Sequence, residues 1–336
     1  MYSEAITKIL GYLPQLGGVQ AEIASLALYG VAVLILISVF DYLYGWFERK
    51  VMAKTQFRHG PNTVGKYGIL QNLADIVKLL SKEEIVPKNA NRYILALGVP
   101  IMLGLMVFLV MLVPLSGGIY GVDTGVSLLL IFVLLSFSPL LVFITGWATG
   151  NKFASVSSQR SVMMLISYEL PMLIVIVAVG IAAKSFSLIS IVNAQAGMPF
   201  AAVMPIGFII FLIALLAELE RPPFDIREAD SELIAGWLTD VSAPYYAQAL
   251  FIDYTRVLLG SLLVSILFLG GWTGPVLPGV AWMAIKVLAV AFTLILVRVS
   301  TVRMRIDKLL RLGWTYMVPL AMLNLLIVSA LYIGVI

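Results

Sequence analysis

The sequence predicts an all-α, polytopic membrane protein with about eight transmembrane helices and amphipathic helices at the membrane surface. The mean hydropathy of the 336 residues is +1.02 and only 12% of them are charged, where a soluble domain has about a quarter. Apolar stretches of about twenty residues, the length that crosses a bilayer as a helix, recur along the chain. The alternating pattern of a membrane β-barrel is absent. Residues 1–336 are therefore interpreted as a single integral membrane domain.

Basic residues between the spans predict the orientation. Nine Lys or Arg lie in 47–92 and five lie between Arg298 and Arg311, whereas the second and sixth loops have none. Because cytoplasmic loops carry the excess of Lys and Arg, we expect loops one, three, five and seven in the cytoplasm and both termini outside. The predicted spans lie near 22–46, 93–115, 124–147, 162–183, 199–220, 246–271, 278–298 and 314–336.

Two further segments have an apolar face but are too polar to span. Residues 1–16 place Ile6, Ile9 and Leu13 on one helical face, so we expect them on the outer surface. In 68–84, the stripe of Leu70, Leu73, Val77 and Leu80 stands opposite polar residues that include Asp75. Two interpretations of this second helix stay open: it floats among lipid headgroups, or it is a lid whose polar face covers a cavity.

The residue types that are missing limit the chemistry. The chain has no cysteine and one histidine, His59. Disulfides, iron–sulfur ligation and thiol catalysis are excluded, and a zinc site is disfavoured. No Walker loop or dinucleotide-binding glycine motif occurs. We therefore expect no metal and no redox cofactor on this chain, and any redox centre on a partner.

Some carboxyl groups lie at membrane depth, where an ionisable group costs roughly 2.5–3.5 kcal/mol and usually faces a cavity or a charge. Glu169 is about seven residues inside its predicted span, two residues before Pro171. We favour a proton-carrying role for it over a structural pair with Arg160. Further candidates are Asp41, Glu218, Glu220, and Asp253 with Arg256, which we interpret as an intrahelical pair.

The stretch Ala217–Gly236 gathers six acidic residues at the end of an apolar helix. That helix must end near Arg221, because Pro222 and Pro223 forbid its continuation. Glu228 and Glu232 would share a face if this stretch is helical. Apolar residues interleave with the acids, which argues against a plain solvated surface. The cytoplasmic loops at about 47–92 and 221–245 are thus predicted to form a polar chamber for protons or a polar headgroup.

Ordered motifs along nearly the whole chain resemble the H subunit of respiratory complex I, the mitochondrial subunit one equivalent. Ser167-Tyr168-Glu169 matches its S-Y-E. The other matching motifs are Phe47-Glu48-Arg49-Lys50, Arg58-His59-Gly60-Pro61-Asn62-Thr63-Val64-Gly65, the amphipathic segment from Leu70 to Glu84, Ala217-Glu218 to Leu233, and Arg298 with Arg305-Ile306-Asp307 to Leu312-Gly313-Trp314.

This resemblance implies the proximal membrane-arm subunit of a redox-driven proton pump, a multi-pass protein of a prokaryotic plasma (inner) membrane. It implies an enzyme only as part of a complex, an NADH-quinone oxidoreductase-type translocase. The substrate would be a quinone or similar lipophilic carrier. FMN or another flavin and the iron–sulfur clusters would lie on peripheral-arm subunits, and antiporter-like membrane subunits would be further partners, with no nucleic acid.

Matched positions also imply the residues of the site. Those of the chamber and proton path would be Glu169, Glu218, Asp225, Glu228, Asp230 and Glu232. Those around the carrier would be Arg49, Arg58, Asp75 and Arg298.

The chain departs from the family pattern at three places near this site, at Asp240-Val241-Ser242-Ala243, at Met164 and at His59. Ubiquinone, menaquinone and a phenazine-type carrier therefore all stay open, as does a different electron-input module. One alternative function is the membrane subunit of a related hydrogenase or sulfur-reducing complex. A secondary ion transporter is disfavoured, because no inverted repeat is evident.

Overall fold

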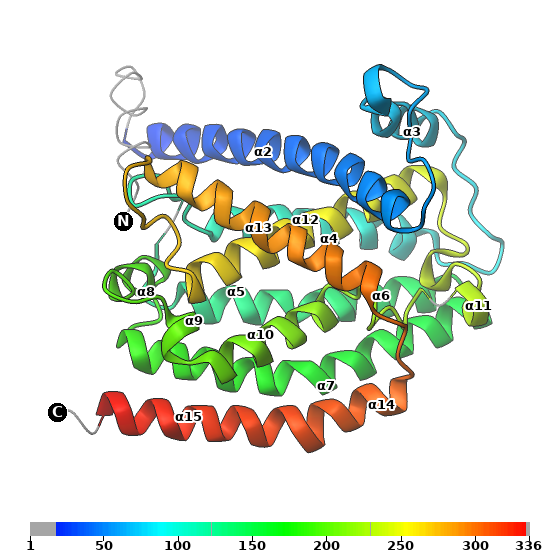
Figure 1. The fold of residues 1–336 in the computed structure, drawn as a ribbon. Coiled ribbons are helices and arrows are strands. Elements are labelled where there is room, and N and C mark those ends of the chain that lie inside the picture. Colours follow the sequence, from blue (N-terminus) through cyan, green and yellow to red (C-terminus); the bar gives the residue numbers. More distant parts are fainter. Residues whose placement is uncertain (1–17, 122, 229, 334–336) are drawn as a thin grey trace.

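The protein is described by a computed structural model that covers residues 18–121, 123–228 and 230–333. The predicted all-α polytopic class is confirmed: within these ranges the chain forms helices and no β-strand, with one isolated bridge between Ser116 and Ile119. In the described part of the chain, seven helices are long and apolar enough to cross a membrane, and they run alongside one another (Figure 1). The amphipathic helix predicted at 1–16 lies outside the described residues.

A helix or a pair of helices lies at each predicted span, although α2 ends nine residues after the predicted end at 46 and α7 begins ten residues before the predicted start at 162. The first half contains α2 (Gly18–Thr55), η1 (Lys66–Gly68), α3 (Gln71–Leu80), α4 (Arg92–Leu112), α5 (Ser127–Leu135), α6 (Phe137–Ala148) and α7 (Lys152–Ala183). The second half contains α8 (Leu188–Ala194), α9 (Phe200–Val203), α10 (Pro205–Glu218), α11 (Asp230–Leu233), η2 (Gly236–Leu238), α12 (Ala243–Phe268), α13 (Gly279–Ser300), α14 (Ile306–Arg311), η3 (Leu312–Met317) and α15 (Val318–Ile333).

Two predicted spans are divided, the one at 124–147 into α5 and α6 at Ser136 and the one at 199–220, which differs more. The span at 199–220 is broken at Met204, so that α9 has only 4 residues and α10 has 14. Pro205 starts α10 because it has no N–H to donate to the preceding turn. A helix of 14 residues is about 21 Å long, less than the roughly 30 Å of a hydrocarbon core. With α10 included, the first described helix begins and the last one ends at the same end of the bundle (Figure 1).

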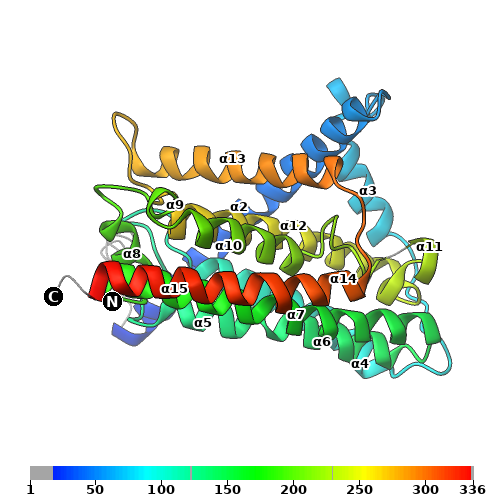
Figure 2. The ribbon, with the colours of Figure 1, turned by 60° about the horizontal axis from the view of Figure 1, so that its bottom comes forward.

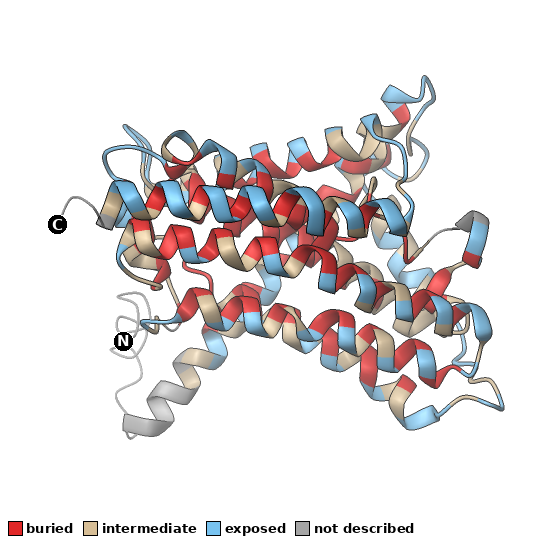
Figure 3. Ribbon diagram, turned by 90° about the horizontal axis from the view of Figure 1, so that it is seen from below, coloured by how far each residue is buried: buried red, intermediate tan, exposed pale blue. Residues whose placement is uncertain are grey.

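Helix α12 is the centre of the bundle. In its most apolar 18-residue window 78% of the residues are buried, against 22% for the windows of α2 and of Ile306–Tyr332. Figure 2 shows α12 between α13 on one side and α4 on the other, and Figure 3 shows the buried residues gathered between the helices. Polar side chains on α12 therefore face neighbouring helices rather than lipid, which decides where Asp253 and Arg256 point.

The last span is held against α7 by a close backbone approach at Gly313. A Cβ on this residue would lie only 2.3 Å from the carbonyl oxygen of Ser167, so no larger residue fits without movement of the helices. The hydroxyl of Ser167 donates a hydrogen bond to the carbonyl of Leu309 over 3.0 Å. The π-helical turn η3 includes Gly313. The S-Y-E and L-G-W motifs are therefore in direct contact.

The first, third, fifth and seventh loops meet at one end of the bundle, the end that carries α3 and α11 (Figure 1). We expect this end to face the cytoplasm. Because the sequence has no cysteine, the labelling of a single introduced cysteine shows on which side of the membrane that residue lies. Lys66→Cys should react with an impermeant maleimide only from the cytoplasmic side. Gly125→Cys, whose Cβ meets no atom within 4 Å, and Leu277→Cys should react only from outside. Reversed accessibility at two of the three sites would contradict this orientation.

Candidate functional site

A polar cavity of about 260 Å³ lies where the ends of several helices meet the acidic loop. Helix α2 contributes Glu48 and Arg49, α12 contributes Asp253 and Tyr254, and α13 contributes Arg298. From the loop after α10 come Glu220, Arg221, Asp225, Arg227 and Glu228. This polar chamber is built from parts of both predicted loops, but none of the residues 232–245, whose side chains the structure describes, lines it.

Glu48 balances two of the cations of the polar chamber. Its carboxylate is 4% exposed and accepts hydrogen bonds from Arg221 at 2.8 Å and from Arg298 at 2.5 Å. Arg221 also stacks over the ring of Tyr254, 5.4 Å from its centroid. These contacts tie the ends of α2 and α13 to the acidic loop, because Arg221 and Arg298 both contact the same oxygen of one buried carboxylate.

A second, larger cavity of about 590 Å³ opens between α2, α3 and α12. Most of its lining is apolar, including Leu43, Leu73, Ile76 and Phe251. It shares Arg49, Leu250 and Tyr254 with the polar chamber. The two cavities therefore adjoin, and a molecule with an apolar tail and a polar head would find matching surroundings in each.

Helix α3 forms one wall of this lateral cavity. Asp75 accepts a hydrogen bond from Arg49 on α2 at 2.7 Å, and Asn72 donates one to the carbonyl of Tyr42 at 2.9 Å. Burial raises the pKa of Asp75, but the hydrogen bonds from Arg49 and Gln71 and the nearby positive charges outweigh it and hold the pKa below its usual value. Of the two interpretations of this helix, the arrangement supports the lid. The side chains of Leu70, Val77 and Leu80 on its apolar stripe are exposed.

The acidic loop distributes its carboxylates among different partners. Asp225 accepts a hydrogen bond from Arg303 at 2.7 Å, and Glu228 accepts one from Arg227 at 3.1 Å. Burial, with the charge of Glu228, raises the pKa of Asp225 above its usual value, although Arg303 acts in the opposite direction. Asp225 and Glu228 thus both line the polar chamber.

Other predicted residues do not join them. Glu232 is 57% exposed and pairs with Arg160 at 2.7 Å on the wall of a different hollow. Helix α11 begins only at Asp230, so Glu228 is outside it and the shared face with Glu232 does not form. The side chain of Asp230 lies outside what is described. Arg58 is exposed and bonds to Gln56.

The predicted pair of Asp253 and Arg256 is wrong. Arg256 lies 3.2 Å from the carboxylate of Glu220, and Asp253 lies 3.8 Å from Arg227. Tertiary neighbours outcompete the intrahelical partner because both side chains project from the most enclosed helix of the bundle. Asp253 therefore belongs to the lining of the polar chamber rather than to an isolated structural pair.

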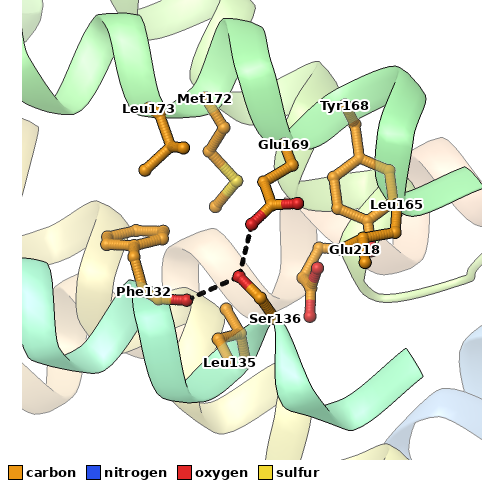
Figure 4. Close-up of a pocket in the computed structure, with 9 residues that line it drawn as sticks. All are labelled: Phe132, Leu135, Ser136, Leu165, Tyr168, Glu169, Met172, Leu173 and Glu218. Atoms are coloured by element: carbon orange, nitrogen blue, oxygen red, sulfur yellow. Dashed lines mark hydrogen bonds between the residues drawn. The ribbon is translucent and has the colours of Figure 1, made fainter. Parts of the chain in front are cut away.

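Glu169 and Glu218 face one small cavity together (Figure 4). Its volume of about 10 Å³ is close to the space that one water molecule needs. The hydroxyl of Ser136, at the junction of α5 and α6, donates a hydrogen bond to Glu169 at 2.5 Å, and Tyr168 adjoins Glu218. Arg160 pairs with Glu232, so the alternative interpretation, a structural ion pair between Arg160 and Glu169, is not observed.

Sequence reasoning missed two groups of functional residues. Glu48 is part of a matching motif but is absent from the predicted site residues; its partners Arg221 and Arg298 are distant in sequence, so no local pattern marks it. Tyr254 and Leu250 join the two cavities, and no sequence signal marks them, because aromatic and aliphatic residues are common throughout the spans.

Comparisons with known proteins agree with these features. A family profile described as NADH dehydrogenase matches residues 27–329. The chain is 40% identical over 309 residues to the second NADH-quinone oxidoreductase H subunit of Syntrophobacter fumaroxidans, covering 89% of this chain and 92% of the relative. It is 41% identical over 292 residues to the corresponding H subunit of Syntrophotalea carbinolica (84% and 88%). It is 38% identical over 310 residues to that of Bacillus thuringiensis (90% and 92%).

Proposed function

The chain belongs to the NADH dehydrogenase family, and on that premise we propose that it is the H subunit in the membrane arm of a complex I-type NADH-quinone oxidoreductase. In this complex it receives the carrier and begins the proton path. The relatives that it matches over most of their length carry the name of that protein. It acts as an enzyme only within the complex, where partner subunits supply the flavin and iron–sulfur centres and further membrane subunits continue the path.

The observation that carries this proposal is the junction of the two cavities at Arg49, Leu250 and Tyr254. A quinone has an apolar tail and a polar head. The tail fits the lateral cavity of about 590 Å³ between α2, α3 and α12, which the lid helix α3 borders. The head then reaches the polar chamber, whose arginines and acids offer hydrogen bonds.

Proton transfer begins at the same place. The polar chamber and the small cavity of Figure 4 are joined by the end of α10, since Glu218 lines the small cavity and Glu220 lines the polar chamber. A water in the small cavity would have Glu169, Glu218, Ser136 and Tyr168 as polar neighbours, enough for the two to four hydrogen bonds that a buried water makes. Charge changes at the carrier are thus felt at Glu218, from which a proton moves to Glu169.

Two measurements on the complex purified through this chain test the proposal. Flavin and iron–sulfur proteins should copurify with it. Ile76→Trp, which fills the lateral cavity from α3, should raise the KM for a long-tailed quinone by about tenfold, or roughly 1.4 kcal/mol. Reduction of a water-soluble acceptor by the peripheral arm should not change.

The matched control is Val77→Trp, which adds the same side chain one position along α3, where the residue is 60% exposed. Its KM for the quinone should stay that of the unchanged complex. If Ile76→Trp and Val77→Trp change the KM for the quinone equally, the carrier does not pass through the lateral cavity. If hydrogenase-type subunits copurify with the chain and the complex does not reduce quinone, the proposed function is wrong and the alternative of a hydrogenase-type complex is favoured.

A further inference from the structure

Glu220 stands at a position where a glycine is usual. It follows the last turn of α10 in the left-handed conformation, with φ 50°. The N–H of Glu220 donates to the carbonyl of Ala217, and the N–H of Arg221 donates to that of Leu216. This is the Schellman pattern, in which glycine avoids the steric cost of about 1–2 kcal/mol that a side chain brings. A glutamate here therefore needs compensation from its side-chain contacts.

The contacts of the Glu220 side chain are strong ones. Its carboxylate forms ion pairs with Arg227 and with Arg256, the latter at 3.2 Å. The hydroxyl of Ser161 on α7 donates a hydrogen bond to it at 2.8 Å. Both arginine side chains are 3% exposed and the Glu220 side chain is 5% exposed. Charge-assisted hydrogen bonds of this kind, out of contact with water, hold the strained residue in place.

Arg256 extends this cluster towards Glu169. Its guanidinium also donates a hydrogen bond to Ser138 on α6 and lies 3.9 Å from the sulfur of Met102 on α4. Ser138 is two residues after Ser136, which holds Glu169. A single buried cation thus reaches from an acid of the polar chamber to the helix that positions the acid of the small cavity.

Glu218, only two residues before Glu220, has very different surroundings. Within the described residues no Lys or Arg side chain forms an ion pair with it, and its Oε1 is buried without a hydrogen-bond partner. The titratable and charged groups that face it are Tyr168 and Glu169 from α7, Arg256 from α12 and Glu220 itself. Those around Glu220 are Arg227 and Glu228 from the loop, and Arg256 and Asp253 from α12.

We propose that Glu220 and Arg256 are positioning residues of the proton path: they form an ion pair beside Glu218, so that Glu218, which has no such partner, is the acid that takes up the proton. This inference rests on the proposed proton path through Glu218. Two adjacent acids would otherwise compete for one proton, because neighbouring carboxylates titrate as a coupled pair. The two arginines remove Glu220 from that competition and set the field in which Glu218 works.

The test compares four assembled complexes in sealed vesicles, with proton translocation driven by carrier reduction measured from pH 5 to 9. Glu220→Gln leaves Arg227 and Arg256 unbalanced beside Glu218, so proton uptake requires a lower pH. Arg256→Gln removes a cation, so uptake occurs at a higher pH. One nearby charge shifts such a titration by about one pH unit or more. The double variant Glu220→Gln/Arg256→Gln should return the profile close to that of the unchanged complex.

Opposite shifts that cancel in the double variant are not expected of residues that only stabilise the fold. If profiles corrected for the amount of complex coincide, or if both single variants shift the same way, the proposal is overturned. Arg256→Lys keeps the charge and should keep the profile, and the charge-balanced double variant remains measurable if Glu220→Gln does not assemble. Glu218→Gln distinguishes a failure of the proton path from a failure of the positioning role. If Glu218→Gln complexes translocate protons normally, the proposed path through Glu218 is refuted. If they lose translocation while the Glu220 and Arg256 variants keep the unchanged pH profile, only the role of the Glu220–Arg256 pair is refuted.

Discussion

Replacing Glu169 by glutamine is expected to lower coupled proton translocation by about a hundredfold or more, since a positioned acid or base contributes about 10²–10⁴-fold to a proton transfer. Glutamine keeps the shape and can still accept the hydrogen bond that Ser136 donates at 2.5 Å, but it cannot carry the proton. Carrier reduction should slow in parallel because the two processes are coupled. The measurement is the initial rate of vesicle acidification for a given amount of assembled complex, with the rate of carrier reduction recorded alongside it.

The control for this prediction is Glu232→Gln. Glu232 is also a glutamate of the predicted set, but it is 57% exposed and pairs with Arg160 on a different hollow. Its loss should leave translocation near that of the unchanged complex. Normal translocation by fully assembled Glu169→Gln complexes would exclude Glu169 from the proton path, and the small cavity of Figure 4 would then be a structural feature only.

Glu48→Gln is expected to prevent stable assembly of the site. Glu48 is 4% exposed and is the shared partner of Arg221 and Arg298. Its neutralisation leaves the two partly buried arginines without their carboxylate, and removal of one partner from a buried ion pair typically costs about 3–5 kcal/mol. The quantity to measure is the fraction of this chain recovered in the assembled complex, together with the temperature at which that complex dissociates.

Glu232→Gln again supplies the comparison, because an exposed ion pair is worth only about 0–1 kcal/mol. Its assembly and dissociation temperature should differ little from those of the unchanged complex. If the two variants lose stability to a similar extent, the burial of Glu48 is not what makes it important. A Glu48→Gln complex as stable as the unchanged one would show that solvent or a partner subunit compensates Arg221 and Arg298.

The fold class and most of the spans could be predicted because they depend on local properties. A run of about twenty apolar residues must satisfy its backbone hydrogen bonds within itself, which only a helix achieves in a bilayer. The exception at 199–220 also has a local cause, since the break at Met204 precedes Pro205. The sequence pattern shows the proline, but whether a helix bends or restarts there depends on its neighbours.

The candidate site was predicted only in part. As with the spans, the features that depend on local sequence could be predicted and those that depend on tertiary neighbours could not. Glu169, Glu218, Asp225 and Glu228 lie beside cavities, because a charge at an apolar helix end or inside a span needs polar surroundings wherever it is. The partners of those charges were not predictable. Arg256 lies three residues from Asp253 in sequence, yet it pairs with Glu220, 36 residues away.

The sequence by itself determined that this chain crosses a membrane many times, that its acids gather after α10, and that its motifs belong to one family. The tertiary structure alone decided that α3 borders a lateral cavity, that Tyr254 joins this cavity to the polar chamber, and that Glu220 rather than Glu218 is held by arginines. The physical reason is range. Hydrophobic periodicity and helix termination act over a few residues, whereas an ion pair in a low-dielectric interior depends on which helices packing brings within about 4 Å.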